Sequence, residues 1–396
     1  MSTAAGLASG RSSLALFSYG FRPFFLAAGV WAATAIALWI AMLTAGLTLP
    51  SRFDPLIWHI HEMLFGFVLA AIGGFLLTAI PNWTGRRPIS GAPLAALFGL
   101  WMLGRLASLV SAWMPAWLAI AADLAFPVAL TAVVAREIIA GGNRRNLPMI
   151  APLVVLAVAE LLTDASLEGY GGLSGYGWRL GLAAILVLIS VVAGRIVPSF
   201  TRNWLAARRQ ARLPAASGAV DRLSLGVLHA SLFAWVFAPA ARPAGIALLG
   251  AAAVNLWRLL RWRGAGTRSE PLLLVLHVGY AWLVIGVGAL GVATLDPAFP
   301  LSAAIHALTA GAIGTMILAV MTRATRGHTG QKLAADGATT LIYALVVLAA
   351  AVRVSAALAT RARPDLLVGA AALWIGAFGL FALRYAPLLL RPRGET

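Results

Sequence analysis

The sequence predicts an all-α polytopic integral membrane protein with about twelve transmembrane helices. Apolar residues make up 61% of the 396 positions and charged residues only 11%, whereas soluble proteins carry about 25% charged residues. The apolar runs are continuous and roughly 20 residues long, which is the length a helix needs to cross a bilayer. A closed β-barrel would instead show shorter segments of alternating polarity.

Each expected span is an apolar run between polar or basic loops. The runs cover 22–47, 56–80, 93–111, 115–138, 147–163, 178–198, 222–239, 243–260, 271–293, 301–322, 338–357 and 365–386. They are expected to form a single transmembrane domain over 1–396. A cytoplasmic N-terminal segment (1–18), a basic cytoplasmic loop (199–221) and a cytoplasmic tail (387–396) complete the expected organisation.

Arginine and lysine gather in alternate loops. One set of loops holds Arg86, Arg87, Arg136, Arg144, Arg145, Arg202, Arg208, Arg209, Arg212, Arg258, Arg261, Arg263, Arg268, Arg323, Arg326 and Lys332, and the other holds only Arg52, Arg242, Arg361 and Arg363. By the positive-inside rule, this asymmetry places both termini in the cytoplasm. The same rule accounts for the net charge of +17, because basic residues orient a protein in the lipid bilayer. No nucleic-acid partner is needed to explain the charge.

Two histidines and a carboxylate open the second span, in the order His59-Ile60-His61-Glu62. Ionisable residues inside a membrane are rare and mark a pathway, a relay or a ligand site. Histidine is also a common ligand of metals and of haem iron. The chain has no cysteine, which excludes iron–sulfur clusters and thiolate copper sites. The pattern therefore predicts a cofactor site built on histidine.

The other intramembrane histidines are expected at two depths. His306 on the tenth span lies about as deep from the outer face as the His59–His61 pair, whereas His229 and His277 enter from the cytoplasmic side. Residues two apart on a helix point about 200° apart, so His59 and His61 are expected to face two different sites.

Two assignments of the metal ligands remain open. In one, His306 and either His59 or His61 are the axial ligands of haem b, while the other histidine of that pair holds a non-haem metal, most simply copper. In this assignment Glu62 is the expected catalytic carboxylate, and His229 and His277 are further candidate metal ligands. In the competing assignment, His229 or His277 binds the haem.

Spans 2 and 10 resemble each other in sequence. His61 and His306 have the same offset to Gly66 and Gly311, and also to the Thr-Gly pairs at 84–85 and 329–330. The sixth span ends in a related pattern at 198–201. The spacing fits three pseudo-repeats of four helices, although chance matching of common residues would look similar.

Further charged residues lie within or at the ends of the spans. Arg105 and Asp123 are deep in adjacent antiparallel spans and are expected to form a structural ion pair, because either charge alone would be costly there. Arg22, Arg195 and Arg323 lie beside helix-breaking residues. They are candidates to bind haem propionates or a quinol head group, and interfacial anchoring is the alternative.

Together these motifs resemble the NnrS family, membrane proteins linked to the bacterial nitric oxide response and described as containing haem and copper. The resemblance covers most of the chain. The segments that carry it are Tyr19-Gly20-Phe21-Arg22-Pro23-Phe24-Phe25, Trp58-His59-Ile60-His61-Glu62 with Gly66-Phe67, 78–85, Leu103-Gly104-Arg105, Asp123, 194–198 with Phe200, Thr201 and Asn203, 306–309 and 321–330. It implies haem b, copper and a place in the bacterial inner membrane.

The architecture also resembles the catalytic subunit of haem–copper oxidases and nitric oxide reductases, which is an analogy of fold alone. Here the paired histidines lie on span 2 rather than span 10, and the copper motif of that superfamily is absent. The expected function is binding and removal of nitric oxide, with reduction to nitrous oxide by quinol or an external electron donor as one route. The alternatives are a non-enzymatic haem sensor or buffer of nitric oxide, and a transporter of metal or haem.

Overall fold

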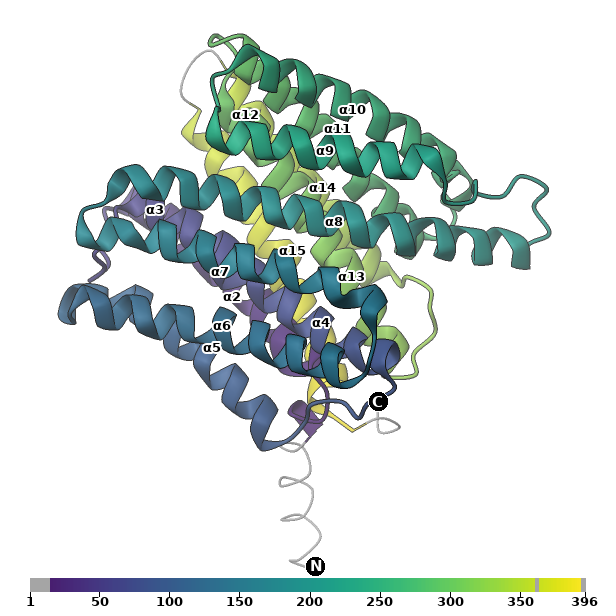
Figure 1. Cartoon of the computed structure of the whole chain (residues 1–396), viewed down its shortest axis with the longest axis horizontal. Coiled ribbons are helices and arrows are strands. Elements are labelled where there is room, and N and C mark those ends of the chain that lie inside the picture. The colour runs from purple at the N-terminus through teal and green to yellow at the C-terminus, as the bar shows by residue number, and fades with distance from the viewer. Residues whose placement is uncertain (1–14, 360–362, 393–396) are drawn as a thin grey trace, which may run out of the picture. The chain divides into compact units, whose positions relative to one another are not determined.

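The computed structural model describes residues 15–359 and 363–392, and this part of the chain contains helices and no strands (Figure 1). The helices are α2 (Phe21–Ala45), α3 (Pro55–His61), α4 (Leu69–Thr84), α5 (Ala92–Val110), α6 (Ala116–Ala140), α7 (Ile150–Asp164), α8 (Gly171–Ala207), α9 (Ala219–Phe237), α10 (Arg242–Arg261), α11 (Pro271–Leu295), α12 (Leu301–His306), α13 (Thr315–His328), α14 (Gly337–Leu358) and α15 (Pro364–Leu390). The all-α prediction is confirmed.

The number of expected spans is also confirmed. Twelve helical stretches of the described chain are long and apolar enough to cross a membrane. Their ends differ from the expectation mainly around the sixth span, where α8 begins at Gly171 and continues to Ala207. The first part of the expected basic loop at 199–221 is therefore helical.

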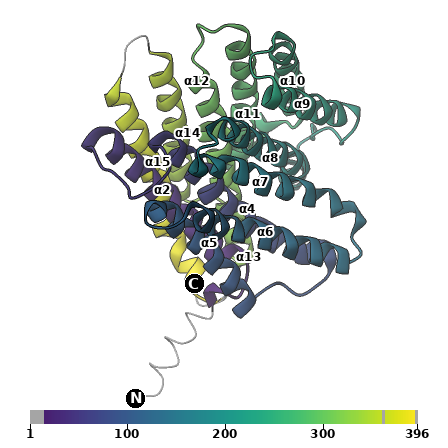
Figure 2. The same ribbon diagram turned by 60° about the vertical axis from the view of Figure 1, so that its left-hand side comes forward.

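The chain divides into two compact units. Unit 1 comprises Met1–Gly181, Met321–Lys332 and Phe378–Thr396, and unit 2 comprises Leu182–Val320 and Leu333–Ala377. Within unit 1, α5 and α6 lie side by side in both views (Figures 1 and 2). All the acidic residues of the candidate site described below belong to unit 1.

The second and tenth spans are each interrupted by a π-helical segment. In span 2, η1 (Glu62–Val68) connects α3 to α4, and in span 10, η6 (Ala307–Gly314) connects α12 to α13. A π-helical turn contains an extra residue and is often found at functional sites. In both spans it begins directly after a histidine, His61 or His306. The sixth span, α8, is an uninterrupted helix, so the matching break is shared by spans 2 and 10.

The start of α3 is determined by local sequence. The side chain of Asp54 accepts a hydrogen bond from the amide of Leu56 at 2.9 Å, and Pro55 occupies the first helical position. Aspartate is a favoured N-cap residue and proline is favoured at the first position of a helix. These two residues therefore set where the helix carrying His61 begins.

Small residues of α4 allow the helices of unit 1 to pack closely. A Cβ atom on Gly74 would lie 2.8 Å from the Phe25 ring, and one on Gly73 would lie 3.1 Å from the ring of Phe126. The Phe126 ring in turn stacks on Phe24, with centroids 5.3 Å apart. This packing fixes α2 and α6 against the helix that continues from η1.

Candidate metal centre

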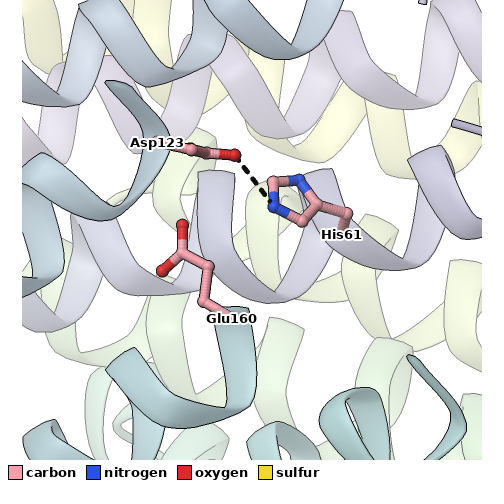
Figure 3. Close-up of side chains that lie close together, drawn as sticks. All are labelled: His61, Asp123 and Glu160. Atoms are coloured by element: carbon pink, nitrogen blue, oxygen red, sulfur yellow. Dashed lines mark ion pairs between the residues drawn. The ribbon is translucent and has the colours of Figure 1, made fainter. Parts of the chain in front are cut away.

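His61 lies at the centre of a buried polar cluster in unit 1. Its side chain is fully buried, and its Nδ1 atom lies 3.1 Å from Oε1 of Glu62. Its Nε2 atom lies 3.0 Å from Oδ2 of Asp123 and 3.1 Å from Oδ1 of Asp164. Figure 3 shows the His61 ring facing Asp123, with the carboxylate of Glu160 nearby. One imidazole is therefore surrounded by carboxylates from three segments of the chain.

Arg105 of α5 connects the acidic residues of the cluster. Its guanidinium contacts Oε2 of Glu62 at 2.7 Å and forms an ion pair with Asp123, and it lies 3.9 Å from Oε1 of Glu160. Residues Arg105 and Asp123, which the sequence placed on neighbouring antiparallel spans, are thus brought together. Gly104 makes this contact possible, because a Cβ atom there would lie 2.6 Å from Oδ1 of Asp123.

Glu62 is held by three donors in addition to its contact with His61. Trp31 Nε1 donates to Oε2 at 2.8 Å, Ser108 Oγ donates to Oε1 at 2.6 Å, and Arg105 makes the contact given above. A Cβ atom on Gly66 would lie 2.6 Å from Oε2 of Glu62 and from Trp31 Nε1. The expected catalytic carboxylate is therefore a fixed group, and its catalytic role remains a prediction.

The π-helical segment that carries Glu62 is stabilised by a side chain of α5. Trp101 Nε1 donates to the carbonyl oxygen of Gly66 at 2.9 Å. A buried carbonyl without a donor costs free energy, so this bond supports the departure from α-helical geometry. The break and the cluster are consequently held by the same helix, α5.

Glu160 and Asp164 of α7 complete the cluster. Both side chains are fully buried, and none of their four carboxylate oxygens receives a hydrogen bond within the described structure. Sequence analysis did not indicate that Asp164 belongs to the site. The missed signal was the four-residue spacing from Glu160 to Asp164, which puts both carboxylates on one helical face within an apolar run.

These side chains meet the geometric requirement for a metal site. One ligand atom each from His61, Asp123 and Glu160 lies within 4.8 Å of the others, and all three residues are buried. Imidazole and carboxylate groups are ordinary ligands of divalent metals. The donor set therefore fits a non-haem metal ion.

Of the remaining histidines expected to bind cofactors, His59 and His306 lie in different units. In unit 1, the ring of His59 stacks on Trp39, with centroids 4.6 Å apart. In unit 2, His306 Nδ1 lies 2.7 Å from the carbonyl oxygen of Ser302, one turn earlier in the helix. A bond of this kind orients the ring and leaves Nε2 available to a ligand. The pairing of His306 with His59 or His61 around one haem remains a prediction.

His229 and His277 also belong to unit 2. His277 Nε2 lies 2.9 Å from Oγ1 of Thr201, while its Nδ1 atom and Nε2 of His229 are buried and have no hydrogen-bond partner in the described structure. A Cβ atom on Gly264 would lie 2.6 Å from the His277 ring. Their expected roles as metal ligands remain predictions.

The three candidate anion-binding arginines have different environments. Arg22 is buried, and its Nη1 atom donates to the carbonyl oxygens of Leu388, Leu389 and Arg391 at 3.3, 3.0 and 2.6 Å. A guanidinium at this position complements the negative C-terminal end of α15. Arg195 is exposed and Arg323 is partly buried, and the proposed binding of propionates or quinol by the three remains untested.

Unit 2 contains a second buried polar network that sequence analysis did not find. Arg258 Nε contacts Oδ1 of Asp221 at 3.0 Å, and its Nη1 atom donates to the hydroxyl of Tyr280 at 2.9 Å. That hydroxyl donates to Oδ1 of Asn255 at 2.6 Å. Charge is balanced here, and Gly194 leaves room for the guanidinium. The network has the character of a structural ion pair.

The fold and the buried cluster define a polytopic membrane protein with a candidate site for a metal ion among its transmembrane helices. Ionisable residues in such positions are expensive and are retained for function. The chain belongs to the NnrS family, since the family model described as NnrS protein matches residues 15–393. Membership fits a role in the nitric oxide response and suggests metal or haem binding. No curated protein matches the chain.

Proposed function

We propose that this protein binds and removes nitric oxide in the bacterial inner membrane, as part of the defence against nitrosative stress, with both termini in the cytoplasm. Family membership supports the link to nitric oxide, and the asymmetric arrangement of basic loops supports the orientation. The cofactors of this proposal are haem b and a non-haem metal, with copper as the metal that the family resemblance implies.

The observation that carries the haem assignment is the geometry of His306. Because the backbone of Ser302 fixes Nδ1, the Nε2 atom of His306 is the natural ligand of haem iron in unit 2. Bound haem would supply an iron site for a diatomic gas. Arg353 of α14 belongs to the same unit as His306, and a guanidinium is suited to pair with a propionate.

Removal by reduction would convert two nitric oxide molecules, two electrons and two protons into nitrous oxide and water. A quinol is the proposed source of the electrons. The apolar helices would allow an uncharged gas to enter from the bilayer.

The test is to measure nitric oxide consumption by the full chain in detergent or membranes, with a reduced quinol analogue and with headspace analysis for nitrous oxide. We expect a Soret band and consumption of nitric oxide by the wild-type protein. His306→Leu should lower haem per chain at least roughly tenfold, because a histidine ligand of haem iron is lost. His328→Leu is the matched control, since His328 lies at the other end of the same span.

The possible outcomes separate the candidate functions. Nitrous oxide formation supports a reductase, and stoichiometric binding of nitric oxide without turnover supports a sensor or buffer. A purified protein without a Soret band would contradict the haem assignment and favour a transporter. Equal haem content in the two histidine variants would remove His306 from the site.

A further inference from the structure

The carboxylate contacts at Nε2 of His61 do not satisfy hydrogen-bond geometry. Its Nε2 atom lies 3.0 Å from a carboxylate oxygen of Asp123 and 3.1 Å from one of Asp164, yet it has no hydrogen-bond partner. The oxygens of Glu160 and Asp164 are equally unpartnered although both side chains are fully buried. Ligands around a shared metal ion would show this pattern, because the lone pair of each ligand atom is directed at the ion and not at a proton of a neighbouring ligand.

The charge of the cluster points in the same direction. Four carboxylates (Glu62, Asp123, Glu160 and Asp164) are buried together, and among the described residues the guanidinium of Arg105 and the imidazole of His61 contact them. Even with a protonated His61, two positive charges face four carboxylates. Uncompensated negative charge in a low-dielectric interior is strongly unfavourable. The balanced network of Arg258 and Asp221 in unit 2 shows what a self-sufficient buried pair looks like in this chain. The cluster in unit 1 lacks positive charge by comparison.

The remaining contacts orient the candidate ligands. Glu62 Oε1 lies 3.1 Å from Nδ1 of His61, which is how a carboxylate fixes the ring of a metal-binding histidine and leaves Nε2 as the ligand atom. Arg105 pairs with Oδ1 of Asp123, so Oδ2 of that carboxylate remains directed at His61. Glu62 and Arg105 are thus positioning residues, and His61, Asp123, Glu160 and Asp164 present the ligand atoms.

We propose that His61, Asp123, Glu160 and Asp164 bind one hard divalent cation of the iron(II) or manganese(II) type. Three carboxylates and one imidazole suit such a cation, whereas copper(I) prefers thiolate and thioether ligands. The carboxylate-rich donor set therefore differs from that of a copper(I) centre. The biological role of the site rests on the proposed function, in which it supplies the non-haem metal. Metal binding itself is tested without nitric oxide.

The experiment uses the purified full chain, which is first stripped of metal with a chelator and then titrated with manganese(II). Binding is measured as the decrease of the electron paramagnetic resonance signal of manganese(II) that is free in solution. Haem iron does not interfere because manganese is the probe. We expect one equivalent to bind to the wild-type protein. Glu160→Gln and Asp164→Asn should each weaken binding by at least about 100-fold, at or above the effect of losing an outer-shell partner.

Glu137→Gln is the matched control. Glu137 is also a buried carboxylate of unit 1, but Arg86 and Arg136 already neutralise it at 2.6 and 2.8 Å. Its amide variant should bind manganese(II) as the wild type does. In parallel, the stripped protein is offered copper(I) in competition with a chromophoric chelator, and we expect no copper to be retained through Glu160 or Asp164.

Thermal unfolding distinguishes loss of a ligand from loss of the fold. Neutralising one carboxylate relieves repulsion, so stripped Glu160→Gln and Asp164→Asn should unfold at or above the temperature of the stripped wild type. Manganese(II) should raise the midpoint of the wild type alone. The proposal is overturned if the wild type binds no manganese(II), if the two variants bind it as tightly as the wild type, or if copper(I) occupies the site through these residues. Failure of nitric oxide removal would leave the proposal standing.

Discussion

The segment around His61 in unit 1 and the segment around His306 in unit 2 share one backbone design but have opposite electrostatic surroundings. In both, a short α-helix ends at the histidine, a π-helical segment follows, and an α-helix completes the span. Each π segment contains a glycine five residues after the histidine, Gly66 or Gly311, and each glycine faces a tryptophan of the preceding span. Spans 2 and 10 are therefore similar in backbone structure as well as in sequence.

The surroundings of the two histidines differ completely. His61 is held by side-chain carboxylates from η1, α6 and α7. His306 contacts a backbone carbonyl of its own helix, and a cationic side chain, Arg353, belongs to the same unit. These surroundings agree with the proposed cation at His61 and the proposed haem at His306. In both spans a histidine directly precedes the change from α-helix to π-helix, and side chains of neighbouring helices determine which ligand that histidine can bind.

The largest expected effect comes from removing the guanidinium group of Arg105 from the acidic cluster. Arg105→Met should lower the free energy of unfolding by about 3–5 kcal/mol, because it leaves buried carboxylates without their partner. Thermal unfolding of the purified protein in detergent measures this loss. Arg353→Met is the counterpart beside His306, where no carboxylate of the described chain forms an ion pair with the arginine, and its stability should be unchanged or higher. Equal losses in both variants would contradict the proposed difference.

An intermediate effect is expected from adding a methyl group to the two matching glycines. Gly66→Ala and Gly311→Ala should each cost about 1–3 kcal/mol through overpacking, since the new Cβ would lie 2.6 Å from Trp31 Nε1 or from the Trp282 ring. Only Gly66→Ala also displaces Glu62 and Arg105. It should therefore weaken manganese(II) binding, whereas Gly311→Ala should leave the manganese titration unchanged. Loss of binding in both variants would show that the effect is not local.

The smallest effect concerns the start of the two spans. Asp54 caps α3 with its side chain, whereas α12 follows Pro300 and has no side-chain cap. Asp54→Ala should cost about 1 kcal/mol, the usual value for an N-cap, and would make the start of α3 resemble that of α12. Asp54→Asn preserves an acceptor and should remain within a few tenths of a kcal/mol of the wild type. Identical midpoints for the alanine and wild-type proteins would show that the cap is dispensable.

The sequence by itself determined the class, the number of spans and the family. Hydropathy and the length of apolar runs are local properties, so each span could be recognised without knowing its neighbours. The His59-Ile60-His61-Glu62 pattern and the deep charges Arg105 and Asp123 were recognisable for the same reason, because ionisable residues stand out in apolar runs.

Tertiary structure alone decided which of these groups meet. The contact between His61 and Glu62 occurs where the helix changes from α to π at Glu62, and an extra residue in a turn is not visible in the hydropathy pattern. Asp164 lies at the end of α7, where a carboxylate in sequence looks like a solvated terminus. Only the packing of α7 near α3 and α6 buries it against His61. The balance of charge around His61 depends on residues that are distant in the sequence, and it could therefore be assessed only from the tertiary structure.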